Sequence, residues 1–381
     1  MTGTVDDEAP ETARARRWAS TMAGHVPGSS GLRQAHDGAP RLGSVTILDR
    51  VAREAAEDVG LAPGATRARG AGARRREEAP DEWRTCFEKD RDRILHANAF
   101  RRLAGKTQVF VFPSDHQRTR LTHALEVAQV ARAIATALRL NVALAEAIAL
   151  GHDCGHGPFG HASEDALDPL VPGGFDHAPW GADVTLASLN LTREVTDGIR
   201  NHSWSRPAPA TPEGEVCALA DRLAYTTHDA EDAARAGVVD LGDLPAVVRE
   251  RAGADRSRQL HAFIHDVVTT SQAAGSVAMS DGLGEALAAL RAWNYERIYL
   301  RPESVRQGEM VQRLLQALVE HHLRDPEAVT AEGPAGTVDG PQAAVAYVAG
   351  MTDRFACAQA VRLLGWPVSA LPEGFDRPPV A

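Results

Sequence analysis

The sequence lacks the features that define several classes of protein. It contains four cysteines and no C-x-x-C pair, which is typical of reduced thiols in a cytosolic protein rather than of a disulfide framework. No run of about 18 apolar residues occurs, so we expect no membrane-spanning helix. The opening residues, MTGTVDDEAPETARARR, lack the apolar segment of a secretory signal. We therefore expect a cytoplasmic protein with no membrane partner.

An excess of positive charge is missing too. Lys and Arg total 41 against 51 for Asp and Glu, a formal net charge of -10, so the chain as a whole does not attract nucleic acid. An anionic substrate must be held by a local cluster of basic residues. A basic run at residues 66–76, TRARGAGARRR, is either a solvated arm or a segment that folds over a phosphate site. Nucleic acid is not an expected partner, and this run is the feature that would support one.

Strand-like runs are scarce, and VFVF at residues 109–112 is the main candidate. Helical patterns are common instead. Residues 122–140 place their apolar side chains on one face of an amphipathic helix. Residues 142–153 form a more apolar helix, which glycine and proline then end. These patterns predict an all-α fold.

The first 66 residues have a different composition from the rest. They are rich in Ala, Gly, Pro and charge, with a short helix expected at residues 46–59. Segments with such weak apolar periodicity bury little surface and tend to stay mobile. We expect a largely disordered N-terminal extension at residues 1–66, followed by a domain at residues 67–381 that is long enough for a sizeable core.

Four histidines and acids lie on or beside apolar helical segments rather than in polar loops. His123 lies in the amphipathic helix, His152 and Asp153 end the apolar one, and Asp221 lies in ALADRLAY. An ionised carboxylate on an apolar helix is costly unless it is paired or bound to a cation. Two imidazoles and two carboxylates provide N and O ligands and balance the charge of one dication. The alternative is a His–Asp pair that is satisfied within the core.

A metal bound in this way would serve catalysis. Four protein ligands leave an octahedral ion with open positions for water and substrate, which favours a catalytic over a structural site. Histidine and aspartate accept Mn, Mg, Fe, Co, Ni or Zn. We therefore expect one divalent metal ion, whose identity the ligands do not define.

Longer motifs surround these residues. In chain order they are FEKDRDRILHANAFRRLAGKTQVF, DHQRTRLTHALEVAQVARAIA, GHDCGHGPFGHASEDAL, ADRLAYTTHDAEDAARAG and YVAGMTDRFA. Together with the order His, His-Asp, Asp, they resemble the HD phosphohydrolase superfamily and, within it, the dGTP triphosphohydrolase (dGTPase-like) family. The resemblance implies an all-α, multi-helix HD-domain phosphohydrolase fold, with the HD core at about residues 116–235.

The resemblance also implies an enzyme, a deoxynucleoside triphosphate triphosphohydrolase. Metal-activated water would attack the α-phosphate of dGTP or another dNTP and release the deoxynucleoside and inorganic triphosphate. The catalytic histidine and acid of the family match His161 and Glu164. Residues three apart can share a helix face, where a carboxylate can orient an imidazole. The alternative is a surface histidine beside an ordinary first-turn glutamate.

Further positions match the family's residues for the two ends of the substrate. Those expected at the phosphates are Arg120, His156, Arg222 and the weaker candidate Lys106. Those expected at the sugar and base are Gln108, Tyr225 and Asp229. Tyr225 and Asp229 follow Asp221 by four and eight residues, so the three share one helical stripe. The alternative for Tyr225 is a half-buried core residue.

The motifs depart from the usual family pattern at a few positions. These are Gln117, Gly157, Ala178 and Thr227, none of which is an expected metal ligand or a member of the catalytic pair. Two other functions stay open. One is an HD phosphohydrolase acting on nucleoside monophosphates or a modified nucleotide, and the other is a non-catalytic, nucleic-acid-binding regulator. We also expect a homo-oligomer.

Overall fold

The structure is a computed structural model that describes residues 12–21, 23–26, 31–36, 38–324, 329 and 340–374. Contacts divide the chain into two compact units, Met1–Leu48 and Asp49–Ala381. Among the described residues, pairing between extended segments is limited to three isolated bridges, and no strand forms. The VFVF run forms bends. The expected all-α fold is therefore confirmed.

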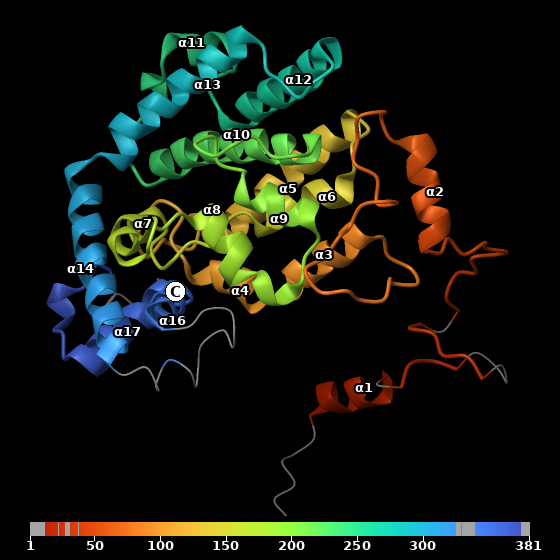
Figure 1. Cartoon of the computed structure of the whole chain (residues 1–381), viewed down its shortest axis with the longest axis horizontal. Coiled ribbons are helices and arrows are strands. Elements are labelled where there is room, and N and C mark those ends of the chain that lie inside the picture. The colour runs from red at the N-terminus through yellow and green to blue at the C-terminus, as the bar shows by residue number, and fades with distance from the viewer. Residues whose placement is uncertain are drawn as a thin grey trace, which may run out of the picture. The chain divides into compact units, whose positions relative to one another are not determined.

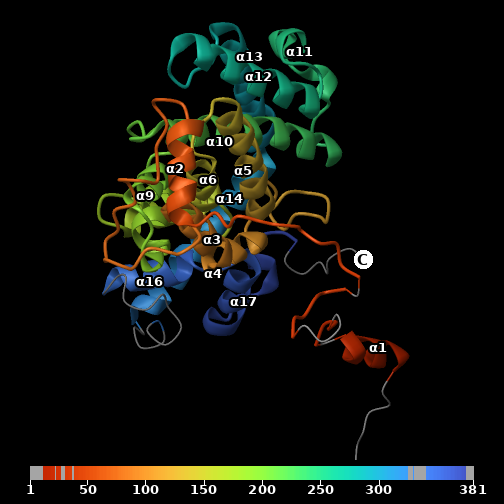
Figure 2. The same cartoon turned by 90° about the vertical axis from the view of Figure 1, so that its right-hand side faces the viewer.

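The larger unit is built from helices of very different lengths (Figure 1). In chain order they are α2 (Arg50–Gly60), α3 (Cys86–His96), α4 (Asn98–Arg102), α5 (Arg120–Ala137), α6 (Val142–Gly151), α7 (His161–Leu167), α8 (His177–Trp180), α9 (Arg193–Arg200), α10 (Pro212–Arg235), α11 (Ala246–Arg251), α12 (Arg256–Ala274), α13 (Asp281–Asn294), α14 (Pro302–Arg324), α16 (Pro341–Ala349) and α17 (Asp353–Leu364). Short 3₁₀ and π turns join several of them. Figure 2 shows α11, α12 and α13 at one end of this unit and α16 and α17 at the other.

Helices α5, α6 and α10 form the centre of the larger unit. α6 contacts α3, α5, α9 and α10, which explains why its sequence is apolar almost all round. Asn141 begins α6 because its side chain accepts a hydrogen bond from the N–H of Leu144. Thr211 caps α10 in the same way, and Pro212 occupies its first turn, where no N–H is needed. Both helices thus begin at defined residues. α6 ends, and α10 passes, beside the same interior region of the larger unit.

A second apolar core lies under the C-terminal helices. It joins side chains of α7, α14, α16 and α17. Asp353, at the start of α17, accepts hydrogen bonds from the N–H of Thr107 at 2.8 Å, the hydroxyl of Thr107 at 2.7 Å and the N–H of Phe159 at 2.7 Å. One buried carboxylate of the C-terminal region therefore fixes two loops of the central part.

The structure corrects the expectation of a largely disordered N-terminal extension. Its described residues include the helix α1 (Ala13–Thr21), and α2 belongs to the larger unit. Glu57 of α2 accepts hydrogen bonds from the N–H of Ala68 at 2.7 Å and from the side-chain amide of Asn141 at 3.1 Å. The helix expected at residues 46–59 forms as α2, although it begins at Arg50 rather than at residue 46. Residues 1–11 lie outside the described part of the chain.

The basic run at residues 66–76 packs against the fold. Arg74 is nearly buried and forms ion pairs with Asp90 at 2.5 Å and Glu78 at 2.9 Å. Arg69 pairs with Asp58 at 2.8 Å. The interpretation of this run as a solvated arm is therefore wrong for most of it, because four of its arginines contact acids or carbonyl groups of the same chain: Arg67, Arg69, Arg74 and Arg76.

Candidate functional site

The four expected metal ligands converge from three helices of the central core. His123 lies on α5, His152 and Asp153 follow the end of α6, and Asp221 lies on α10. His123 Nε2 lies 3.1 Å from Asp221 Oδ1, and His152 Nε2 lies 3.6 Å from that same oxygen. Asp153 places Oδ1 at 3.5 Å from His152 Nε2 and Oδ2 at 3.9 Å from His123 Nε2. Neighbouring ligands of one cation, each about 2.1 Å from it, lie about 3 Å or more apart, so this spacing suits a single ion.

The hydrogen bonds around these residues also fit a metal. His152 Nδ1 lies 2.6 Å from the carbonyl oxygen of Ala149, and because a carbonyl only accepts, Nδ1 carries the proton. The lone pair of Nε2 then points at the carboxylates, where this buried atom has no hydrogen-bond partner among the described residues. Metal-binding histidines are typically oriented by such a bond from the other ring nitrogen. The residues present therefore fit a divalent ion.

Both carboxylates of the cluster stay ionised. Burial acts to raise the pKa of Asp153, but Arg120 and His152 hold it well below its usual range. Burial acts in the same direction on Asp221, and the neighbouring imidazoles of His123 and His152 hold its pKa low. Two buried negative charges side by side make a strong site for a cation.

Two of the expected phosphate ligands border Asp153. The Arg120 guanidinium is almost fully buried, and its Nη1 donates to Asp153 Oδ2 at 2.8 Å. Its Nε and Nη2 have no acceptor among the described residues, so two donors are available to an anion. His156 Nε2 lies 3.2 Å from Asp153 Oδ1. The structure thus places Arg120 and His156 at the metal cluster.

The expected catalytic pair forms and extends to a third residue. His161 begins α7, and its Nδ1 lies 2.8 Å from Glu164 Oε2. The other oxygen of Glu164 accepts bonds from the N–H of His177 at 3.0 Å and from His177 Nδ1 at 2.6 Å. Burial acts to raise the pKa of Glu164, but these histidines hold it well below its usual range. Glu164 is therefore an ionised link between an exposed histidine and a buried one.

Sequence reasoning missed His177 and His202. His177 begins α8, and its ring stacks on that of His156 with centroids 3.7 Å apart. His202 follows α9, is 2% exposed and lies with its Nε2 3.2 Å from His177 Nε2. Neither lies at the end of an apolar helical run like the one that identified His152, because His177 begins the four-residue helix α8 and His202 lies two residues beyond α9.

Two glycines explain how these segments approach so closely. A Cβ atom on Gly155 would lie 1.9 Å from the carbonyl oxygen of His177 and 2.4 Å from the backbone nitrogen of Gly181. Gly160, just before α7, has φ +64°, and a Cβ there would lie 2.9 Å from the carbonyl oxygen of Thr107. Only glycine at both positions brings α7 and α8 against the loop at residues 152–160, which we call the His-Asp loop.

Tyr225 and Asp229 lie on α10 in the stripe that begins with Asp221. Arg291 Nε donates to the Tyr225 hydroxyl at 2.9 Å, and the Tyr299 hydroxyl donates to Asp229 Oδ2 at 2.5 Å. Burial raises the pKa of Asp229 to about 7. Asp229 Oδ1 has no partner among the described residues. Arg291 and Tyr299, which sequence reasoning missed, therefore border the expected sugar residues.

Arg222 lies beside an aromatic ring rather than an acid. Its guanidinium carbon is 3.5 Å from the ring centre of Trp204, and the indole N–H of Trp204 donates to the carbonyl oxygen of Ala218 at 2.9 Å. Burial lowers the pKa of Arg222. Within the described part of the chain no ion pair to Arg222 forms, so its charge is available to an anion.

The remaining expected residues lie less directly at the site. Lys106 is buried, and its ammonium group donates to the carbonyl oxygens of His156 and, at 3.0 Å, of Ala349. Burial lowers its pKa to about 8. These bonds give Lys106 a role in joining the His-Asp loop to α16. Gln108 has a buried Oε1 with no partner among the described residues.

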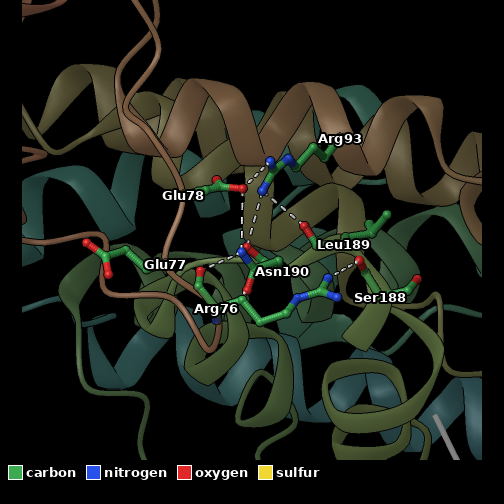
Figure 3. Close-up of a pocket in the computed structure, with 7 residues that line it drawn as sticks. All are labelled: Arg76, Glu77, Glu78, Arg93, Ser188, Leu189 and Asn190. Carbon is green, nitrogen blue, oxygen red and sulfur yellow. Dashed lines mark hydrogen bonds and ion pairs between the residues drawn. The ribbon is translucent and has the colours of Figure 1, made fainter. Parts of the chain in front are cut away.

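A surface cavity of about 440 Å³ lies elsewhere, between the segment after the basic run, α3 and the turn before α9. Figure 3 shows its polar groups directed at one another: Arg93 pairs with Glu78 at 2.7 Å, and the side-chain amide of Asn190 donates to the carbonyl oxygen of Arg76 at 2.8 Å. Because Arg93 and Glu78 already pair with each other, the cavity offers little to a charged ligand. The His/Asp cluster remains the better candidate site.

Comparisons with known proteins agree with this geometry. The HD domain family matches residues 120–226, and the phosphohydrolase-associated domain family matches residues 277–362. A deoxyguanosinetriphosphate triphosphohydrolase-like protein of Caldanaerobacter subterraneus subsp. tengcongensis is 43% identical over 78% of this chain and 90% of its own. Proteins of the same description from Clostridium perfringens and Caulobacter vibrioides are 40% and 38% identical over 81% and 74% of this chain, and over 91% of their own length in each case.

A solved structure of a hypothetical protein from Aquifex aeolicus aligns with 72% of this chain and 68% of its own, at 19% identity and a TM-score of 0.42. This likeness carries no part of the assignment.

Among the described residues, no helix is both long and apolar enough to cross a membrane. The domain matches cover the His/Asp cluster, and the relatives match over most of their length. The chain therefore belongs to the HD-domain phosphohydrolases, in the deoxyguanosinetriphosphate triphosphohydrolase-like family.

Proposed function

We propose that this protein is a metal-dependent triphosphohydrolase that converts a deoxynucleoside triphosphate to the deoxynucleoside and inorganic triphosphate. The observation that carries the proposal is the buried cluster of two imidazoles and two carboxylates, with the His161–Glu164 pair next to it. The relatives described as deoxyguanosinetriphosphate triphosphohydrolase-like support the substrate class.

His123, His152, Asp153 and Asp221 would hold the ion. When bound, a divalent metal lowers the pKa of its water and supplies a nucleophile near neutral pH. The protein contributes the orientation of the ligands, since the Ala149 carbonyl fixes the His152 ring. Burial of the cluster excludes bulk water, which strengthens the electrostatic interactions within it.

The leaving 5'-oxygen of the nucleoside needs a proton, and His161 is the donor that we assign. Its side chain is 73% exposed, so it faces an open space where a substrate can lie. Glu164 accepts from Nδ1, which leaves Nε2 to donate. The bond to Glu164 also fixes the orientation of the imidazole, as a positioned general acid requires.

The triphosphate would be held by Arg120, His156 and Arg222. Arg120 presents two unpaired donors beside Asp153, His156 lies next to it, and Arg222 is held by the ring of Trp204 instead of by a carboxylate. Bidentate donors of this type suit phosphate oxygens. Because Lys106 is bound to two carbonyl groups, it has the least support as a phosphate ligand.

Tyr225 and Asp229 would select the deoxyribose. The Tyr225 ring packs beside Asp221 on α10, where it would fill the space of a 2'-hydroxyl, and Asp229 Oδ1 is free to accept from the 3'-hydroxyl. Gln108 would contact the sugar or base. Replacing Tyr225 by alanine tests this directly, because the preference for dNTP over NTP should fall.

A regulator that binds nucleic acid has less support. The arginines of the basic run are engaged within the chain, as with Arg74 and Asp90, so few of them are left for a phosphate backbone. An HD phosphohydrolase acting on nucleoside monophosphates would use the same metal cluster. The donor groups of Arg120 and Arg222 that have no partner among the described residues favour a longer phosphate chain.

The test is an assay of metal-supplemented protein over all dNTPs, NTPs and deoxynucleoside monophosphates, with products resolved by chromatography. Inorganic triphosphate and deoxynucleoside are expected, whereas orthophosphate from monophosphates would establish the alternative. Asp153→Ala should lose both the bound metal and the activity. His261→Ala, which changes an exposed histidine of α12, is the matched control and should retain both.

A further inference from the structure

A carboxylate of the C-terminal helices holds two loops next to the proposed site. Asp353 begins α17 and is 2% exposed. Its Oδ1 accepts from the N–H of Phe159, and its Oδ2 accepts from the N–H and the hydroxyl of Thr107. Nothing in the proposed mechanism uses this carboxylate, yet Phe159 lies only two residues before His161.

The turn at Phe159 and Gly160 has a backbone conformation that must be held from outside. Phe159 has φ +65° and Gly160 has φ +64°. Glycine adopts such a conformation freely, whereas a bulky aromatic residue does so only where its surroundings impose it. Here the Phe159 ring is buried in the second apolar core, and its N–H donates to Asp353 at 2.7 Å. The direction in which the chain enters α7 therefore depends on this bond.

Bonds made by α7 itself shape the same turn but do not place it. The hydroxyl of Ser163 donates to the carbonyl oxygen of Gly160 at 2.6 Å and accepts from the N–H of Gly157 at 3.0 Å. Because Ser163 lies on α7, these bonds would move with that helix. Asp353 lies on a different helix, and its second oxygen is bound by Thr107. It therefore ties the start of α7 to another segment of the fold.

The segment that contains Thr107 also carries the start of α5. Thr107 pairs with Thr119 in an isolated bridge, and the N–H of Arg120 donates to the carbonyl oxygen of Lys106 at 3.2 Å. The guanidinium of Arg120 packs against the turn before α7, since a Cβ atom on Gly160 would lie 2.5 Å from its Nη2. One carboxylate thus fixes the spacing between the start of α5 and the start of α7.

We propose that Asp353 is a positioning residue for His161, the proton donor of the proposed function on which this inference rests. Asp353 acts through the turn at Phe159 and Gly160, which sets the place of His161 relative to Arg120. A displacement of about 1 Å at a reacting group can lower a rate about 10²-fold. Loss of the carboxylate should therefore impair proton donation to the leaving oxygen more than it impairs binding of the metal or the substrate.

The experiment compares two substrates of the metal-loaded, full-length protein. One is the dNTP that wild-type protein hydrolyses fastest, and the other is p-nitrophenyl triphosphate, whose p-nitrophenolate leaves without a proton. Asp353→Asn should lower kcat for the dNTP about 10–100-fold with little change in KM. For p-nitrophenyl triphosphate the loss should stay below about threefold, because this leaving group needs no acid. The metal content of the variant should equal that of wild type.

Asp266→Asn is the matched control. Asp266 of α12 also accepts from a backbone N–H and a hydroxyl, both of Ser280, at 2.9 Å and 2.6 Å. Helix α12 lies at the end of the larger unit opposite to α17 (Figure 2). The control should lose stability in a similar way and keep its kcat for both substrates.

Two kinetic outcomes would overturn the inference. One is an equal loss for both substrates in Asp353→Asn, which would indicate a general structural role, and the other is a normal rate for the dNTP. If Asp353→Asn does not fold, Thr107→Val removes one of the three bonds and takes its place. Thr107→Val should show the same selective loss to a smaller extent, and unchanged rates would count against the inference.

A spectroscopic readout tests the inference without any turnover. The ring signals of His161 in ¹⁵N-histidine-labelled protein are identified by their absence in His161→Gln, and they report the ring tautomer and its bond to Glu164. They should shift in Asp353→Asn and stay in place in Asp266→Asn. Unchanged signals in Asp353→Asn would refute the positioning role. If wild-type protein releases triphosphate from no dNTP, the proposed function fails, and these signals still decide whether Asp353 places His161.

Discussion

Glu164 accepts hydrogen bonds from two histidines that come from different helices. Its Oε2 is bound by His161 and its Oε1 by His177. A carboxylate placed in this way does not act on one imidazole alone. Changes to Glu164 should therefore have wider effects than changes to the histidine that it was expected to orient.

Replacing His161 by alanine should lower kcat about 10²–10⁴-fold, because the leaving oxygen loses its proton donor. KM should change much less, since proton donation occurs only in the transition state. The double variant His161→Ala/Glu164→Gln should be clearly slower than His161→Ala, because the second change also releases His177. Steady-state kinetics with metal content measured in parallel checks this. Equal rates in the single and double variants would limit Glu164 to the His161 pair.

Asp229 should make the stability of the protein depend on pH. Burial raises its pKa from the usual range of an aspartate to about 7, so the folded state holds this proton more tightly than the unfolded state does. The associated stability is complete below about pH 4 and is lost as the pH rises to about 7. Asp229→Asn cannot ionise and should escape this loss.

The comparison is made by urea unfolding of wild-type and Asp229→Asn protein at pH 5 and pH 8. From pH 5 to pH 8, the variant should gain free energy of unfolding relative to wild type, by roughly 3 kcal/mol at most. If the free energy of unfolding changes with pH by the same amount in both proteins, Asp229 is ionised throughout this range.

At the scale of helices and loops, the close contact of the His-Asp loop with α8 depends on one missing side chain. Gly155→Ala would place a methyl group 1.9 Å from the carbonyl oxygen of His177, so the loop or α8 must move. We expect a loss of about 1–3 kcal/mol in the free energy of unfolding and weaker metal binding. Gly284→Ala on α13, where no atom lies within 4 Å of the new Cβ, is the control and should be neutral or slightly stabilising. Equal melting temperatures and Mn²⁺ affinities for the two variants would contradict this account.

The sequence predicted the helices and the grouping of the four expected metal ligands better than it predicted what surrounds them. The ends of α5 and α6 follow from apolar periodicity and capping, which are local signals. His177 begins α8, which has four residues, and His202 lies two residues beyond α9. The position of His177 depends on Gly155 and on the Glu164 carboxylate. Such placement comes from tertiary contact, so no local pattern reveals it.

Tertiary contacts also explain why the N-terminal region was wrongly expected to be largely disordered. The segment before residue 67 reads as mobile because its composition is poor in large apolar residues. It is ordered in part by polar contacts instead, such as those of Glu57 with Ala68 and Asn141. Lys106, which is expected at a phosphate, donates to the carbonyl oxygens of His156 and Ala349, and the sequence does not indicate these bonds. Charged residues used within a fold look like binding residues when only the sequence is read.

At the scale of the whole molecule, the two compact units predict how the chain tolerates shortening. Removal of residues 1–48 should leave the melting temperature and kcat unchanged, because the larger unit begins at Asp49. Removal of residues 1–60 also deletes Glu57 and should lower the melting temperature by several degrees. Calorimetry measures the melting temperature of the two truncated chains, and an activity assay measures their kcat. A large loss in the first truncation would assign residues 1–48 a role in stability or catalysis.

The hydrogen bonds of Asp353 bear on how the two regions of this chain are inherited together. Its carboxylate lies in the region that matches the phosphohydrolase-associated domain, yet it holds Thr107 and Phe159, which flank the HD region and the His-Asp loop. A recombination event that exchanged the C-terminal third for that of a distant relative would have to supply an acceptor at the same point, or leave three buried donors unpaired. Selection should therefore transmit the two regions as one unit, even though they match two separate family descriptions.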